Sequence, residues 1–148
     1  MSAKQLRVLR ISVVVLLVLL FFQYESGMAV NIANPPSLPA FSFSDNNAFN
    51  TALNTAGGLA QPHAILGFLL WLLSVVNLVL SLRTGIRSIQ ILGSLILLSI
   101  TFAGIGGSIF VQSGFANDQA SHAMAANFIF SYTFAFLELY FLKGDPRP

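Results

Sequence analysis

The chain has 148 residues, of which 55% are hydrophobic and only 8% are charged. Soluble domains devote about a quarter of their residues to charge, so this composition excludes an ordinary soluble enzyme. Seven basic residues cannot form a patch that would hold nucleic acid, and we expect no such partner. The absence of cysteine excludes disulfides, thiolate metal sites and covalent c-type haem. The sequence therefore predicts one small transmembrane domain, 1–148, in contact with the lipid bilayer.

Four apolar segments are long enough to cross a hydrocarbon core of ~30 Å as helices. We expect these helices at about 8–28, 62–82, 88–112 and 121–142. The first segment follows three basic residues and also has the form of a signal peptide. No clean small-x-small cleavage motif follows it, which favours a retained helix. The predicted fold class is all-α, an integral membrane four-helix bundle.

Charge placement predicts the orientation of the chain. All seven Lys and Arg residues fall in the segments 1–10, 83–88 and 143–148. Under the positive-inside rule these segments face the cytoplasm, so we expect a multi-pass protein of the cell membrane with both termini cytoplasmic. The first outer loop, 29–61, is then long. Polar residues at 44–47 followed by apolar residues at helical spacing predict a short amphipathic helix in this loop, over the outer mouth.

The only two histidines of the chain are expected at equal depth. His63 opens the second predicted helix and lies 20 residues before Arg83, while His122 opens the fourth and lies 21 residues before Lys143. At 1.5 Å per residue both imidazoles lie ~30 Å from the inner boundary. Two histidines at one level on neighbouring parallel helices are what a six-coordinate haem requires. We therefore predict that both bind the haem iron of a haem b.

Small residues accompany both histidines, as a flat porphyrin would require. Gly67 follows His63 by one turn and Ala126 follows His122 by one turn, while Gly104 and Gly107 of the third helix reach the same level. We predict that these four residues contact the cofactor. Two alternatives stay open: the small residues can serve close helix packing, and the histidines can be polar residues at the membrane interface. A weak metal site that includes Asp118 is a further alternative.

Two stripes of residues are expected to face the bundle interior. The second helix presents His63, Gly67, Leu70, Ser74, Asn77 and Ser81, and the fourth presents His122, Ala126, Ile129, Thr133, Phe136 and Tyr140. Asn77 and Asn127 are expected to form hydrogen bonds between helices. Glu138 is expected near the inner interface, as a snorkelling residue or one of an inter-helix pair, and a role in proton relay is the alternative.

Residues 60–142 resemble one half of a haem A synthase. In that family each half carries a histidine at the outer start of its second and fourth helices, and His63 and His122 match these positions in order and spacing. The stretch 107–115 is similar to a glycine-, valine- and Ser-Gly-containing stretch of the family. The resemblance implies a haem held by the two histidines. Ala60 stands where the family has an acidic residue thought to act in haem oxidation, and the chain has no second bundle.

Three functions are compatible with these patterns. The first is a membrane b-type haem protein for electron transfer or haem handling, with a redox partner at the outer face. The second is an enzyme, a haem A synthase-like oxidoreductase, which the missing acid disfavours. The third is a non-catalytic accessory subunit of a respiratory or photosynthetic complex. The small size also favours assembly, either as a homo-oligomer or with other membrane subunits.

Overall fold

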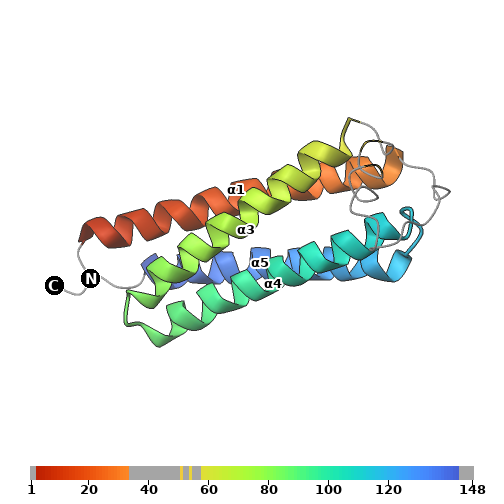
Figure 1. Ribbon diagram of the computed structural model, residues 1–148. Coiled ribbons are helices and arrows are strands. Elements are labelled where there is room, and N and C mark those ends of the chain that lie inside the picture. The colour runs from red at the N-terminus through yellow and green to blue at the C-terminus, as the bar shows by residue number, and fades with distance from the viewer. Residues whose placement is uncertain (1–2, 34–50, 52–53, 55–57, 144–148) are drawn as a thin grey trace.

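The computed structural model describes residues 3–33, 51, 54 and 58–143, and its elements are four long helices (Figure 1). They are α1 (Ala3–Ala33), α3 (Ala60–Leu82), α4 (Arg87–Gln112) and α5 (Asp118–Lys143). Each is long and apolar enough to cross a membrane. The prediction of an all-α protein with four helices that are long and apolar enough to span a membrane is therefore confirmed.

The four helices form an elongated bundle in which each helix packs against two others (Figure 1). α1 contacts α3 and α5, and α4 contacts the same two helices, so α3 and α5 lie on a diagonal. α1 and α4 begin, and α3 and α5 end, at one end of the bundle, which we call the basic end. Its described basic residues are Lys4, Arg7, Arg10, Arg83, Arg87 and Lys143. We call the opposite end, which carries both histidines, the distal end.

The observed helices extend beyond the predicted ones, most of all in the first helix. α1 begins five residues before the predicted start at 8 and continues five residues past the predicted end at 28. Hydrophobicity alone ends a predicted helix at its apolar core, whereas a helix continues into the polar interface as long as its backbone stays hydrogen-bonded. The predicted amphipathic helix of the 29–61 loop lies outside the described residues, apart from Thr51 and Asn54, which are helical.

The predicted interior stripe of α3 is confirmed in its membrane-embedded part. Leu70, Ser74, Asn77 and Ser81 are all buried, at spacings of four, three and four residues. Such spacing keeps the four side chains on one face of a helix. The polar members of the stripe therefore point away from lipid, where their hydroxyl and amide groups find partners.

The predicted interior stripe of α5 is wrong. Ile129, Phe136 and Tyr140 are 59%, 59% and 67% exposed. The buried face of α5 instead carries Ala120, Ser131, Ala135, Glu138 and Leu142. The physical reason is the cost of polar groups in lipid, which turns Ser131 and Glu138 toward the bundle axis and leaves aromatic residues outside. Asn127 also departs from its prediction, because its amide donates to the Ala123 carbonyl of its own helix.

The short connections from α3 to α4 and from α4 to α5 are stabilised by residues with positive φ and by a side-chain cap. Gly85 turns the chain between α3 and α4 with a φ of 70°, a conformation that glycine adopts without strain. Between α4 and α5, Asn117 accepts a hydrogen bond from the Ala120 amide and so caps the start of α5. The side chain of Phe115 is buried against Phe110, which anchors this second turn to the bundle.

Gly93→Ala is expected to destabilise the bundle where α3 and α4 meet. A Cβ at Gly93 would lie 2.8 Å from Oγ and 2.9 Å from Cβ of Ser81, and overpacking of this kind costs about 1–3 kcal/mol. Gly104→Ala is the matched control, because a Cβ there meets nothing within 4 Å. Thermal unfolding of both variants in one detergent checks this; equal melting temperatures would contradict the close contact.

Candidate ligand cavity at the distal end

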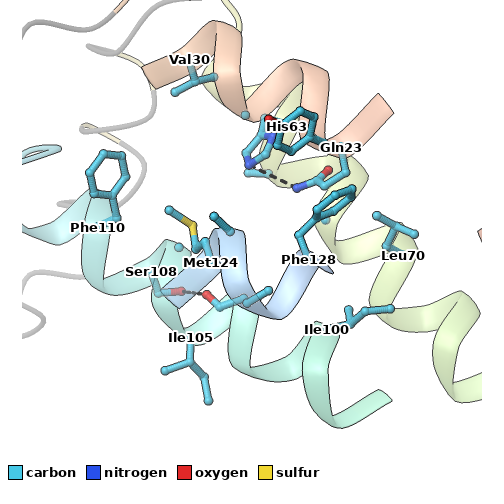
Figure 2. A pocket seen from close by; sticks show the side chains of 18 of the residues that line it. Gln23, Val30, His63, Leu70, Ile100, Ile105, Ser108, Phe110, Met124 and Phe128 are labelled. Atoms are coloured by element: carbon cyan, nitrogen blue, oxygen red, sulfur yellow. Dashed lines mark hydrogen bonds between the residues drawn. The ribbon is translucent and has the colours of Figure 1, made fainter. Parts of the chain in front are cut away.

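A cavity of about 620 Å³ lies in the distal half of the bundle, with walls from all four helices (Figure 2). Its volume is within the range usual for small-molecule sites. Most of the lining is apolar and includes Leu70, Ile100, Phe110 and Phe128. His63 and Gln23 contribute ring nitrogens and an amide to this apolar surface. An apolar space with a few polar groups at one wall is typical of a ligand site.

The structure gathers four of the six predicted cofactor residues around this cavity and leaves two outside it. His63, Gly67, Gly104 and Gly107 line the cavity. His122 and Ala126 are exposed on α5 and do not line it. The two histidines do lie at the same end of the bundle, as their sequence positions indicate, but they do not point into one space. The α5 residues that reach the cavity are Ser121, Met124, Ala125, Phe128 and Ser131.

His63 is held by two polar residues of α1. Its Nδ1 lies 2.9 Å from Oγ of Ser26, and its Nε2 lies 3.2 Å from Nε2 of Gln23 (Figure 2). The Ser26 hydroxyl also donates to the Gln23 carbonyl, at 3.0 Å. Since that bond uses the one hydrogen of the hydroxyl, the Nδ1–H of His63 donates to Ser26. His63 is then a neutral imidazole whose Nε2 carries a lone pair, which accepts a hydrogen bond from the Gln23 amide.

Glycines make this approach of α1 to α3 possible. A Cβ at Gly27 of α1 would lie 2.9 Å from Cε1 of His63, and a Cβ at Gly67 of α3 would lie 3.1 Å from Nε2 of Gln23. Each helix thus offers a glycine beside the polar side chain of the other. Gly67 is therefore a packing residue at the α1–α3 contact as well as a lining residue. Gly104 differs, because a Cβ there would enter open space.

Gln23 has a polar atom without a partner. Its Oε1 is buried and accepts no hydrogen bond, while its Nε2 bonds to His63. Buried polar atoms usually have partners, and an exception in a cavity wall marks a place where a ligand or water donates a hydrogen bond. The wall formed by α1 and α3 thus offers an imidazole lone pair and an amide oxygen side by side.

The sequence analysis did not identify the cavity-lining residues of α1 or the face of α5 that turns toward the bundle interior. Gln23, Tyr24, Gly27 and Met28 of α1 all line the cavity. The signal for them was weak, because α1 has the form of a signal peptide and its cavity residues follow no polar stripe. For α5 a signal existed in the sequence: Glu138 marks the interior face, and Met124 falls on that face at steps of three and four residues.

The described residues contain no group of three or more His, Cys, Asp or Glu side chains that could hold a metal ion. The predicted alternative of a weak metal site that includes Asp118 therefore has no group of this size to support it in this part of the chain. Nothing in the comparisons with protein-family models, curated proteins and solved structures matches the chain. The resemblance to haem A synthases thus rests on the residues given above.

Gly27→Ala is expected to displace the His63 ring and break its bonds to Ser26 and Gln23. Nitrogen NMR of histidine-labelled protein should report an Nδ1–H tautomer for His63 in the wild type and its loss in the variant. His122 is the internal control, since it is exposed on another helix. An unchanged His63 signal in Gly27→Ala would contradict the packing of the ring against α1.

Proposed function

We propose that the protein is a membrane haem protein that binds haem b in the distal cavity, where the Nε2 of His63 would bind the iron. The observation that carries the proposal is the state of His63, a neutral imidazole with its Nε2 lone pair at the wall of an apolar cavity. A neutral imidazole nitrogen is the usual protein ligand of haem iron. When bound, the haem would supply a one-electron carrier.

The surroundings of His63 fit that role. The Nδ1–H bond to Ser26 fixes the tautomer and the ring orientation, as the outer hydrogen bond of a metal-bound histidine commonly does. The Gln23 amide would leave Nε2 when a ligand binds there. The open space beside Gly104 provides room for a flat ring system in the cavity.

Met124 is a better candidate than His122 for a second residue that would bind the iron. It lines the cavity from α5, whereas His122 does not. Its thioether packs at Gly107, where a Cβ would lie 3.2 Å from Sδ. Histidine and methionine together are a known axial pair for haem iron, and they raise its potential. The predicted pairing of His63 with His122 would require α5 to rotate about its axis, away from its buried polar face.

Electron transfer suits this site better than haem oxidation. No acidic residue lines the cavity among the described residues, and Glu25 is exposed on α1. An enzyme of the haem A synthase type needs an acid near its haem, and Ala60 takes that position. We place the protein in the cell membrane, with its basic end cytoplasmic and a redox partner at the distal end. Assembly as a homo-oligomer or with other membrane subunits is part of the same proposal.

Absorption spectra of protein purified in detergent after expression with ample haem test the proposal. A reduced-minus-oxidised α band of the b type is expected in the wild type, lost in His63→Ala and shifted or broadened in Met124→Leu. His122→Ala is the matched control and should keep the wild-type spectrum. A colourless wild type would overturn the proposal. Loss of the band in His122→Ala with a normal Met124→Leu would restore the bis-histidine pairing.

A second candidate function, binding of a membrane quinol, is favoured by the unpartnered Oε1 of Gln23. A quinol hydroxyl would donate to this oxygen, and the apolar lining would hold the ring and its tail. Trp71, the only tryptophan of the chain, lines the cavity and provides a fluorescence signal.

Quenching of Trp71 by a short-chain benzoquinol measures this binding. Gln23→Leu should weaken it about fivefold, since one hydrogen bond is worth about 1 kcal/mol. Gln119→Leu, at an exposed position of the same end, is the control and should bind like the wild type. Absence of saturable quenching in the wild type would exclude this candidate.

A further inference from the structure

The carboxyl group of Glu138 is buried inside the bundle and does not line the distal cavity. The side chain is 0% exposed. Asn77 Nδ2 donates to its Oε2 at 2.8 Å, and Ser81 Oγ lies 2.5 Å from its Oε1. Both partners belong to α3, the diagonal neighbour of α5. The predicted snorkelling role is therefore wrong, and the predicted inter-helix role is correct.

The Ser81 hydroxyl makes two contacts, with Glu138 and with the Asn77 carbonyl, but has only one hydrogen to donate. The Ser81 hydroxyl is 2.8 Å from the Asn77 carbonyl of its own helix, in the geometry of a donated bond. A hydroxyl has one hydrogen, so with that bond made, the short contact between Ser81 and Glu138 needs its hydrogen from the carboxyl group. The arrangement is then complete only if Glu138 is a neutral acid that donates to Ser81 and accepts from Asn77.

No basic side chain among the described residues bonds to the Glu138 carboxyl group, so none is in place to stabilise its ionised form. The titratable and charged groups of that end, among the described residues, are Lys4, Arg7 and Arg10 on α1, Arg83 after α3, Arg87 on α4, and Tyr132, Tyr140 and Lys143 on α5; Lys4 and Arg7 are exposed. Arg83, Arg87, Tyr140 and Lys143 are exposed. Arg10 is partly buried, but its guanidinium donates to the Leu142 carbonyl and not to the carboxyl group. An ionised carboxylate without a cation is costly inside a membrane, whereas the neutral acid is not.

Three further buried polar atoms in the basic half of the bundle have no hydrogen-bond partner among the described residues. Asn77 Oδ1 is one, on a side chain that is 0% exposed and already bonded to Glu138 through its nitrogen. Ser12 Oγ and Arg10 Nε on α1 are two more. Leu142, which Arg10 contacts, is one turn of α5 from Glu138, about 6 Å along the axis. Unpaired buried atoms of this kind are positions for bound water.

We propose that Glu138, with Asn77 and Ser81, is a proton-binding site inside the membrane, which holds a proton on the carboxyl group at neutral pH and exchanges it with the basic end. The unpartnered oxygens of Asn77 and Ser12 accept hydrogen bonds from the water that carries the proton. The ligand is a proton and not a metal cation, because a protonated carboxyl group lets Ser81 keep its bond to the Asn77 carbonyl and still contact Glu138. This site does not depend on the haem proposal.

An apolar carbodiimide, dicyclohexylcarbodiimide, is the probe for a protonated carboxyl group in lipid. The acid adds across one C=N bond, its hydrogen goes to nitrogen, and the resulting O-acylisourea rearranges to a stable N-acylurea without loss of any atom. Full-length protein in liposomes at neutral pH should gain the mass of one reagent on the peptide that contains Glu138. Glu138→Gln should lose this adduct, and Asp118→Asn, an exposed acid at the distal end, should keep it.

Infrared spectroscopy provides a second measurement that does not depend on access of the reagent. The wild type should show the C=O band of a protonated carboxyl at neutral pH, with a shift in D₂O, and Glu138→Gln should lack it. Ser81→Ala removes the acceptor, so the band should move to higher frequency and remain. A missing adduct with this band present supports the proton site, since only reagent access has failed.

Two results would overturn the proposal. One is the absence of both the adduct and the protonated-carboxyl band in folded wild-type protein. The other is protection from the carbodiimide by added Na⁺ at constant pH, because the oxygens would then hold a metal cation. Neither result depends on haem, so haem spectra of the same preparation report on the distal cavity separately.

Discussion

A polar group in the hydrocarbon interior must find its partner within the protein, and this bundle provides one across its axis. Asn77 and Ser81 of α3 bond to Glu138 of α5, although these two helices are diagonal to each other. The bonds require both helices to turn their polar faces to the axis, which sets their rotation along the whole length. At the distal end the same rotation directs His63 toward α1 and brings Met124, in place of His122, to the cavity. The candidate ligand site is thus a consequence of where the buried acid points.

Glycines beside polar side chains explain how the helices hold together without a hydrophobic force between them. Gly27 adjoins His63, Gly67 adjoins Gln23 and Gly93 adjoins Ser81, each close enough that a Cβ would contact the neighbour. Close backbone approach and a hydrogen-bonded side chain therefore occur together at the α1–α3 contact and at the α3–α4 contact. Gly104 has no such neighbour. The small residues thus divide into packing residues and one that leaves space in the cavity, a distinction that composition and spacing do not make.

The sequence predicted the four helices, the α3 stripe and the placement of both histidines at one end of the bundle, because these depend on segment length, polarity and helix direction. The prediction was wrong about the rotation of α5, because it placed the small residues after His122 on the interior face, where the structure has Ser131 and Glu138. A histidine near a helix end can remain exposed at the membrane interface, whereas an acid five residues before the helix end, in the apolar part, cannot. Glu138 was therefore the stronger marker of the interior face. The contribution of α1 could not be predicted, since Gln23 and Ser26 acquire their role only from contact with α3.

The two polar centres lie at opposite ends of one stripe of α3. His63 and Asn77 are 14 residues apart, about 21 Å along the helix axis. Between them the stripe contains Leu70 and Ser74, and the Ser74 hydroxyl donates to the Trp71 carbonyl of its own helix. Ser131 on α5 likewise donates to Asn127. These hydroxyls are occupied by backbone oxygens, so no hydrogen-bonded path joins the carboxyl to the imidazole in the part of the chain that the structure describes. The proton that we propose at Glu138 would therefore exchange toward the basic end, separately from a ligand bound beside His63.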